Sequence, residues 1–368
     1  KMLIKSPKKV KKNLYHPNIN KLVAFYGLNP VIKFCQSCTY SNQKPNSEKE
    51  YKHKPNTKKP SLKLDKKNIC NPCNIQNYKS KIDWKKREDQ LKKLCDKHRK
   101  KDGSYDCLVP GSGGKDSFFQ AHVLTKIYGM KPLAVTFSHN WFSETGFYNL
   151  QRCLEVFNLD HIQFTPARGL VNKIARKSID VIGDSCWHCH AGVGAFPLQI
   201  ATKFKIPLLV WGESIAENDG REGHGCSKTK FDRDYFTKVS ARLTADEMVD
   251  ENLSAKDMHP FQLPSYEEID NTGVFGIHMG DYIFWDDEKQ TEWIRDTYGW
   301  AETEIEGTYK GYKSAECIMA GMHDFTCYLK RGFGRATVQT ALDVRNGLLT
   351  REEGFRLIEK HDQEIPEA

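Results

Sequence analysis

One stretch, residues 107–122, constrains the fold of this 368-residue chain more than any other. Its apolar start, Cys107-Leu-Val-Pro, runs into the turn Gly111-Ser-Gly-Gly-Lys-Asp-Ser117, and a helical pattern then begins. Glycine permits positive φ and close approach of a ligand to the backbone. The first amides of a helix lack internal partners and carry the positive end of the helix dipole. A strand, a tight turn and a helix N-terminus in this order predict a site for phosphate or pyrophosphate.

From residue 105 onwards, short apolar runs alternate with helical patterns. Strands are predicted at residues 105–109, 131–137, 161–164 and 207–211, and helices at residues 117–128, 145–157, 170–182 and 192–204. This alternation implies right-handed crossovers and a doubly wound parallel sheet of the α/β class. Such a sheet binds ligands at the carboxyl ends of its strands. Those ends carry the glycine turn, Ser138-His-Asn140 and Gly212-Glu213-Ser214.

The chain beyond residue 214 is less regular. Residues 217–232, rich in glycine and charge, are expected to form a mobile loop that serves as an active-site lid. Residues 240–258, 286–298 and 333–362 have helical patterns, and Gly347 and Thr350-Arg-Glu-Glu353 have the sequence of a helix C-cap and a capping box. The aromatic run 275–285 is expected to pack in the core or to line a pocket.

Composition divides the chain into a basic arm with a metal-binding module (1–79), a linker helix (80–104), the α/β domain (105–240) and a mostly helical region (241–368). Residues 1–101 contain 28 Lys and Arg against 7 Asp and Glu, a net +21, whereas the rest contains 28 basic and 40 acidic residues, a net −12. A lysine-rich surface is most often simply solvated, but it can also bind nucleic acid or an acidic partner. Because the part that carries the glycine turn is acidic, nucleic acid is not expected to bind there.

Twelve cysteines without an export signal predict reduced thiols and metal ligation in the cytoplasm rather than disulfides. The CxxC pairs Cys35/Cys38 and Cys70/Cys73 predict a four-thiolate zinc site, which closes the polar segment between them and supplies its folding energy. The two pairs are further apart than usual, and four unrelated cysteines in a loop are the alternative. No apolar run is long enough to span a bilayer, so no membrane association is expected.

A third pair, Cys186 and Cys189, precedes a helix and the fourth strand. Three interpretations stay open. The pair and its neighbouring histidines form a small zinc site; or it holds an iron–sulfur cluster with a distant third cysteine such as Cys317 or Cys327; or it lines the substrate pocket without a metal. A CxxC pair at this location resembles the cluster-binding pair of tRNA thiolation enzymes.

The pattern Ser112-Gly-Gly-Lys-Asp-Ser117 resembles the PP-loop of ATP pyrophosphatases, which split ATP into AMP and pyrophosphate. An ordinary glycine-rich turn is the alternative. The resemblance implies an ATP site at residues 112–117, with adenosine at the end of the second strand. The cofactor-binding residues expected from it are Ser112, Gly113, Gly114, Lys115, Asp116, Ser117, Thr136, Phe137, Ser138 and Gly212.

Three charged residues are the catalytic candidates. Asp116 is a plausible ligand for Mg²⁺, which prefers carboxylate and phosphate oxygens. Lys115 would neutralise charge that develops on the leaving pyrophosphate. Glu213 is a second candidate for binding Mg²⁺ or for proton transfer, and a solvated loop carboxylate is the alternative.

Further motifs extend the resemblance over residues 20–365. They are Thr136–Trp141, Cys186–His190, Trp211–Ser214, Gly280–Trp285, Lys330–Thr337, Asp343–Gly347 and Thr350–Glu353. Together with the glycine turn they resemble the N-acetyl sugar amidotransferase family. The resemblance implies that ATP adenylates the acetamido oxygen of an N-acetyl sugar, nucleotide-linked or acidic. Ammonia then displaces AMP to give an acetamidino sugar for surface polysaccharide such as O-antigen or LPS.

The same resemblance implies a partner. Ammonia would come from a glutaminase that resembles the glutaminase and cyclase subunits of imidazole glycerol phosphate synthase, because the chain has no convincing glutaminase nucleophile of its own. Arg331, Arg335 and Arg345 are candidates for recognising a carboxylate or diphosphate on the sugar, although each is as readily a surface or helix-capping arginine.

Two other functions fit parts of the sequence. A tRNA thiolation enzyme would use the same adenylation chemistry and would explain the basic N-terminal region and the CxxC pairs, but not the acidic body. A zinc-ribbon scaffold with a degenerate loop is the second alternative, and the intact Ser112–Ser117 pattern argues against it.

Overall fold

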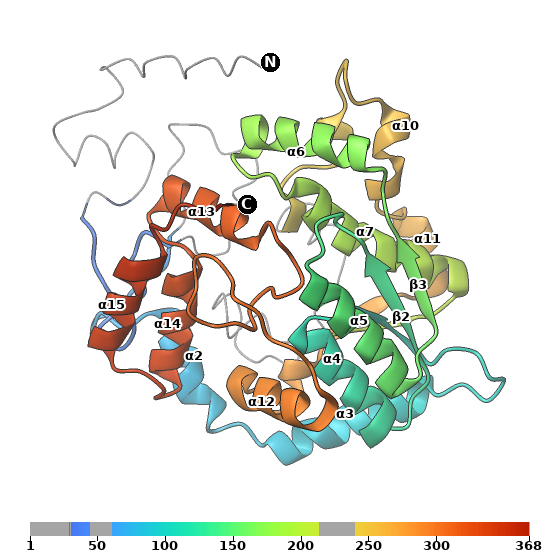
Figure 1. Cartoon of the computed structure of the whole chain (residues 1–368). Coiled ribbons are helices and arrows are strands. Elements are labelled where there is room, and N and C mark those ends of the chain that lie inside the picture. The colour runs from blue at the N-terminus through green and yellow to red at the C-terminus, as the bar shows by residue number, and fades with distance from the viewer. Residues whose placement is uncertain (1–28, 30, 45–60, 213–239, 368) are drawn as a thin grey trace.

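Figure 1 shows the computed structural model of the chain, which describes residues 29, 31–44, 61–212 and 240–367. The basic arm at residues 1–20, the predicted lid at 217–232 and Glu213 lie outside these described residues. Within the described ranges, no helix combines the length and the apolar character that crossing a membrane requires.

Five parallel strands form one sheet in the order β3-β2-β1-β4-β5. They are β1 (Cys107–Pro110), β2 (Pro132–Phe137), β3 (His161–Phe164), β4 (Leu208–Trp211) and β5 (Phe275–His278). In register, Leu108 of β1 pairs with Leu133 of β2 and with Leu209 of β4. The predicted α/β class and the parallel sheet are confirmed. The strand order reverses between β1 and β4, and open α/β sheets bind their ligands at this switch point.

The sequence does not predict β5 as a strand. Its residues, Phe275-Gly-Ile-His, belong to the aromatic run 275–285, which lies outside the regular alternation of strands and helices that marks the other four strands. In the structure β5 pairs in parallel with β4, with Val210 opposite Ile277. The sheet therefore takes an edge strand from beyond residue 240.

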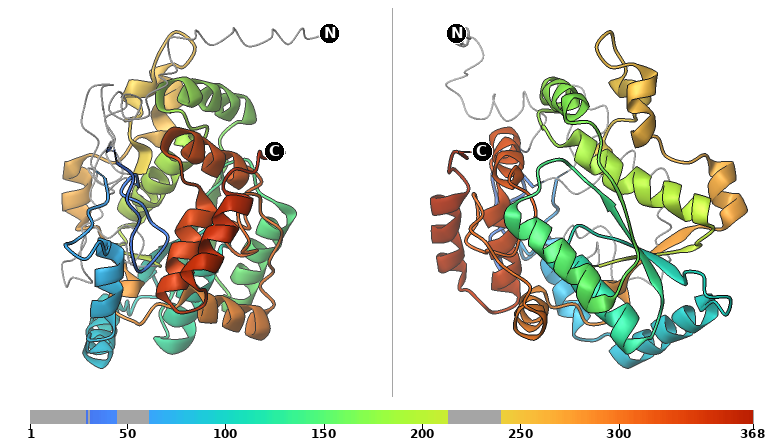
Figure 2. Two further views of the ribbon diagram at one scale, coloured as in Figure 1. Left: turned by 90° about the vertical axis from the view of Figure 1, so that its left-hand side faces the viewer. Right: turned by 45° about the vertical axis from the view of Figure 1, so that its right-hand side comes forward.

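Helices cover both faces of the sheet (Figure 2). One face carries α3 (Trp84–His98), α4 (Lys115–His122), α5 (Glu144–Phe157) and α12 (Asp287–Tyr298); the other carries α6 (Arg168–Ile182), α7 (Trp187–Phe204) and α11 (Tyr266–Thr272). Successive strand residues point into different cores, so Leu108 packs with residues of α6 and α7, whereas Val109 packs with residues of α3. Burial on both faces explains the nearly continuous apolar runs of these strands.

Residues 240–258 do not form the continuous helix that their pattern indicates. The structure has short helices there, Asp246–Met248 and α10 (Ala255–Met258), separated by a turn. The Asp250 carboxylate accepts hydrogen bonds from the amides of Asn252 and Leu253, which stabilises this turn. A capping box of Ser254 and Asp257 then begins α10. Local side-chain-to-backbone bonds have replaced helical ones here.

The C-terminal helices are α13 (Ala320–Arg331), α14 (Arg335–Arg345) and α15 (Arg351–His361). Gly347 follows α14 at φ +75°, and the capping box of Thr350 and Glu353 begins α15, so both predicted helix signals are confirmed. The cysteine module, which ends in α2 (Asn71–Lys79), packs against α14 and, through the rings of Phe34 and Phe355, against α15. There the hydroxyls of Thr39 and Thr340 lie 3.0 Å apart.

Candidate active site and metal centres

The glycine turn lies between β1 and α4, where the sequence places it. Gly113 has φ +80°, and a Cβ on it would lie 2.4 Å from the Leu150 amide nitrogen of α5. The Gly113 carbonyl accepts a hydrogen bond of 2.9 Å from the Trp300 indole. Gly114, with ordinary φ −62° and ψ 158°, is the N-cap of α4. The turn at the start of α4 is thus packed tightly against α5.

A cavity of about 350 Å³ opens beside this turn, at the carboxyl ends of β1, β2 and β4. Its volume falls in the range of small-molecule and cofactor sites. Six of the predicted cofactor-binding residues line it: Ser112, Gly114, Asp116, Ser117, Phe137 and Gly212. Gly212 is close to the turn, because a Cβ there would lie 3.0 Å from the Asp116 Cβ.

Thr136 and Ser138, predicted to contact adenosine, have structural partners instead of cavity-lining positions. The Thr136 hydroxyl donates to the Gly111 carbonyl at 2.5 Å and lies 2.9 Å from the His161 ring. The Ser138 amide donates to the Phe164 carbonyl. These residues hold the turn and the end of β2 in place beside the cavity.

Glu316 is the residue that the sequence analysis misses. It lines the cavity from the segment before α13, with the Ser112 hydroxyl 3.5 Å from one carboxylate oxygen. A Cβ on Gly114 would lie 3.5 Å from both carboxylate oxygens. Burial, strengthened by the Asp116 charge, raises the pKa of Glu316. No local motif marks it, because the contact joins positions far apart in the sequence.

Asp116 and Glu316 place two carboxylates at the cavity where phosphate binding is predicted. Carboxylates repel phosphate unless a cation lies between them, and Mg²⁺ prefers oxygen ligands from carboxylates and phosphates. The donor set therefore fits a Mg²⁺ that accompanies a nucleotide, as predicted for Asp116 alone. The segment carrying Glu316 is fixed by α5, since the Ser143 amide donates to the Glu316 carbonyl at 3.0 Å.

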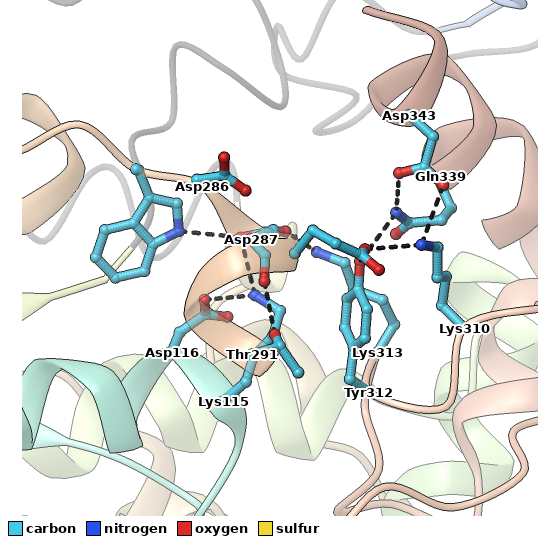
Figure 3. A network of polar contacts seen from close by, with 12 residues as sticks. Lys115, Asp116, Asp286, Asp287, Thr291, Lys310, Tyr312, Lys313, Gln339 and Asp343 are labelled. Carbon is cyan, nitrogen blue, oxygen red and sulfur yellow. Dashed lines mark hydrogen bonds and ion pairs between the residues drawn. The ribbon is translucent and has the colours of Figure 1, made fainter. Parts of the chain in front are cut away.

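Lys115 does not line this first cavity but belongs to a buried polar network (Figure 3) and lines a second, neighbouring cavity. Its ammonium is 2.5 Å from Asp116 and 3.0 Å from Asp287, the first residue of α12. Asp287 also pairs with Lys313 and accepts from the Trp285 indole. Burial opposes the Asp287 charge, but Lys115 and Lys313 outweigh it and hold its pKa well below the usual value. In this arrangement Lys115 anchors the turn to α12.

A second cavity of about 300 Å³ adjoins the first. Gly114, Asp116 and Glu316 line both cavities. The remaining walls of the second cavity come mainly from the C-terminal region, including Lys313 and Arg335. The Arg335 guanidinium makes two contacts with the Asp324 carboxylate. Of the three arginines considered for substrate recognition, Arg335 is the one at this cavity.

Cys35, Cys38, Cys70 and Cys73 come together as predicted. All four are buried, and their sulfur atoms lie within 4.8 Å of one another. The Cys35–Cys73 and Cys38–Cys70 sulfur distances are 3.8 and 3.6 Å. These separations suit four thiolates around one zinc ion or an iron–sulfur cluster. The clustering is confirmed, and zinc remains the predicted occupant.

The charge around this cluster fits an anionic metal centre. Four thiolates and one divalent ion carry a net charge of −2, which a buried site must balance. The Arg345 guanidinium packs over the Tyr40 ring at 5.3 Å; although burial opposes its charge, the nearby tyrosine and cysteines raise its pKa. Arg351 donates to the carbonyls of Cys35 and Cys38, both at 3.1 Å. Arg345 therefore belongs to the cysteine module rather than to a substrate site.

Cys186 belongs to a second group of possible metal ligands. Its possible metal-binding neighbours are Asp184 and His323, and the three ligand atoms lie within 4.8 Å of one another. Cys189 instead lines the first cavity, and burial raises the pKa of its thiol. His323 Nδ1 is 3.0 Å from Asp184. Burial opposes the charge of His323, but hydrogen bonds with Asp184 and Cys186 raise its pKa to about 10.

Comparison with known protein families identifies the C-terminal part. Residues 306–368 match the family described as “LPS biosynthesis protein WbpG-like, C-terminal domain”. This match confirms, over this segment, the surface-polysaccharide family to which the C-terminal motifs pointed. The segment includes α13, α14 and α15, and it contains Glu316, His323 and Arg335. A search of curated proteins found no significant match to the chain.

Several solved structures share a remote likeness. U34-tRNA thiolase NcsA from Methanococcus maripaludis, determined with its [4Fe-4S] cluster, is 13% identical over 89% of each chain, with a TM-score of 0.34. NMN synthetase from Francisella tularensis is 10% identical over 61% of this chain and 98% of its own, with a TM-score of 0.30. NAD⁺ synthetase from Burkholderia pseudomallei is 12% identical over 62% and 94%, with a TM-score of 0.28.

Proposed function

We propose that this chain, whose C-terminal segment is WbpG-like, is an AMP-forming amidotransferase that converts the acetamido group of an N-acetyl sugar into an acetamidino group. The product would enter lipopolysaccharide, in keeping with the family of residues 306–368. One observation carries the proposal: two cavities adjoin at Gly114, Asp116 and Glu316.

In this proposal each cavity binds one substrate. ATP occupies the first cavity, with its phosphates on the amides of the glycine turn at the start of α4. The sugar occupies the second cavity, whose walls come mainly from the WbpG-like segment. The shared residues would then stand where the acetamido oxygen meets the α-phosphorus. This division explains why a general nucleotide-binding turn and a family-specific segment line neighbouring spaces.

The chemistry needs activation, because an amide carbon is a poor electrophile. The acetamido oxygen attacks the α-phosphorus of ATP and pyrophosphate leaves, which gives an O-adenylated imidate. Ammonia adds to the imidate carbon, a proton is lost, and AMP leaves with the former acetamido oxygen. Mg²⁺ held by Asp116 and Glu316 would stabilise the charge on the phosphates. The turn would bind the leaving pyrophosphate through backbone amides.

The reactive form of ammonia is the neutral molecule. In this proposal, ammonia is produced by another protein. We infer a glutaminase partner of the type that works with imidazole glycerol phosphate synthase. Free ammonium salts are expected to replace that partner in vitro at high concentration and alkaline pH. This replacement makes the chain testable by itself.

The test is product analysis with the full chain. It would be incubated with ATP, Mg²⁺, ammonium and a panel of nucleotide-linked N-acetyl sugars, including uronates. We expect AMP, pyrophosphate and a sugar in which NH has replaced one oxygen. Asp116→Asn should abolish the reaction, whereas Glu155→Gln, an exposed carboxylate on α5, should not change it. AMP formation that requires tRNA and a sulfur donor, with no sugar product, would favour the thiolation alternative.

A further inference from the structure

A second cluster of metal-binding side chains lies where the turn between α6 and α7 meets α13. Asp184 and Cys186 belong to that turn, and His323 belongs to α13. A carboxylate oxygen, a sulfur and a ring nitrogen lie within 4.8 Å of one another. Asp184 is 1% exposed and Cys186 is 7% exposed. Three different donor types therefore converge on one shielded point.

We propose that Asp184, Cys186 and His323 bind one zinc ion, separate from the four-cysteine centre. Zinc accepts thiolate, imidazole and carboxylate ligands together, and a site with three protein ligands keeps one position for water or another molecule. Magnesium and calcium select oxygen donors, so the thiolate disfavours them. The inference is independent of the proposed reaction, because it concerns these three side chains alone.

The carboxylate is oriented before any ion binds. One Asp184 oxygen accepts a 2.9 Å hydrogen bond from the Cys186 amide, and the Arg242 guanidinium is 3.5 Å from the other oxygen. The Ser178 hydroxyl donates to the Asp184 carbonyl at 2.6 Å and so fixes the turn. Groups that hydrogen-bond to a metal ligand without contacting the ion itself hold metal-binding carboxylates in position.

The position of the cluster suggests what the ion does. His323 belongs to the WbpG-like segment, whereas Asp184 and Cys186 belong to the sheet domain. Cys189, within the first turn of α7, lines the first cavity, beside the glycine turn. An ion bound by His323, Asp184 and Cys186 would therefore link α13 to the start of α7, which forms part of the wall of that cavity. Losing it should loosen the C-terminal segment without removing any residue of the glycine turn.

The alternative is an iron–sulfur cluster on Cys186, Cys189 and Cys317, in which Asp184 and His323 only pair with each other. The two sites make opposite predictions for single substitutions. The zinc site requires His323 and Asp184 but not Cys189 or Cys317, whereas the cluster requires the two further cysteines but not His323.

The experiment measures metal per chain in the purified full-length protein by mass spectrometry of the elements. Wild type should hold one metal centre at each of the two ligand groups. His323→Gln and Asp184→Asn should each lose the second centre and keep the first. Cys189→Ser, Cys317→Ser and Cys327→Ser should keep both, the last as a matched control on α13. His323→Asp, which preserves a ligand, should retain more metal than His323→Gln.

Cobalt substitution gives a second readout that does not depend on activity. Co²⁺ at a site with one thiolate absorbs more weakly in the thiolate-to-metal band than Co²⁺ at the four-cysteine centre, so the difference spectrum between wild type and His323→Gln isolates the second site. Circular dichroism of each variant shows whether it is folded. Unchanged metal content in folded His323→Gln and Asp184→Asn overturns the proposal. Loss of iron and visible colour in Cys189→Ser or Cys317→Ser alone also overturns it.

Discussion

Replacing Gly114 with alanine should weaken ATP binding roughly 100-fold or more and leave the fold intact. The added Cβ would lie 3.5 Å from the carboxylate oxygens of Glu316, an ordinary van der Waals contact. The backbone angles of Gly114, φ −62° and ψ 158°, are accessible to alanine. The methyl group would nevertheless occupy the space between the turn and Glu316, where the proposal places the phosphates.

The expected change in folding stability is small. Alanine is a poorer N-cap than glycine by about 0.5–1 kcal/mol. Alanine also lowers the conformational entropy of the unfolded chain, which raises the free energy of unfolding by about 0.4–1 kcal/mol. The two effects nearly cancel, so Gly114→Ala should unfold within a few degrees of wild type. Losing two charge-assisted bonds from amides to phosphate costs about 3–6 kcal/mol, which weakens ATP binding roughly 100-fold or more.

Gly113→Ala is the matched variant with the opposite result. Its Cβ would meet the Leu150 amide nitrogen at 2.4 Å and Cα at 2.7 Å, both backbone atoms of α5. A left-handed φ costs a residue with a side chain about 1–2 kcal/mol. Overpacking against a helix backbone costs about 1–3 kcal/mol more. At roughly 2–4 °C per kcal/mol, the melting temperature should fall on the order of 10 °C.

Two measurements on the same proteins test this reasoning: thermal unfolding without ligand, and calorimetric titration with Mg²⁺ and a non-hydrolysable ATP analogue. Gly114→Ala should retain stability and lose binding. If Gly114→Ala binds the analogue with wild-type affinity, the phosphates do not lie against the turn. If it is as unstable as Gly113→Ala, the geometry derived for the two glycines is wrong.

Three further predictions concern charged and metal-binding groups. Glu316→Gln should weaken Mg²⁺–ATP binding at least about tenfold, which is the loss typical even of residues that contact a metal only through its ligands. Because the pKa of Glu316 is raised, the affinity of the wild type for Mg²⁺–ATP should fall as the pH is lowered toward that pKa. The variant should lack this pH dependence. Asp287→Asn should destabilise the protein by about 3–5 kcal/mol at neutral pH. Because the folded pKa of Asp287 lies below its usual 3.8, that difference should persist above this pH and shrink as the pH falls through the folded value, as acid titrations followed by denaturant unfolding would show. Cys73→Ser should release metal and make residues 61–79 sensitive to protease, whereas Cys95→Ser, at a buried position of α3, should retain metal.

The sequence predicts those parts of the site that are contiguous along the chain. The glycine turn, the strand–turn–helix order and the first two CxxC pairs each carry their chemistry within a few residues, and all three take the predicted form. Lys115 is a partial exception. Its position beside the turn is predictable, but its orientation depends on Asp287, a buried carboxylate from a distant helix that a local pattern does not reveal.

The residues that the sequence analysis misses come from irregular or distant segments. Glu316 reaches the cavity because the start of α5 binds its backbone, and this contact joins elements with no common motif. His323 meets Cys186 only through the packing of α13. β5 is missed for a different reason, because it lies in an aromatic run beyond the regular alternation of strands and helices. The positions of Glu316 and His323 depend on contacts between distant parts of the chain, which the spacing of residues along the sequence does not reveal.

The central claim is that AMP is transferred to the acetamido oxygen, and an isotope label tests it directly. The N-acetyl sugar would be prepared with the heavy oxygen isotope in its acetamido carbonyl and incubated with the protein, ATP, Mg²⁺ and ammonium. Mass spectrometry of the released nucleotide should show AMP that carries the heavy oxygen, together with an acetamidino sugar that has lost it. Unlabelled AMP, or heavy oxygen retained in the sugar product, would contradict the account.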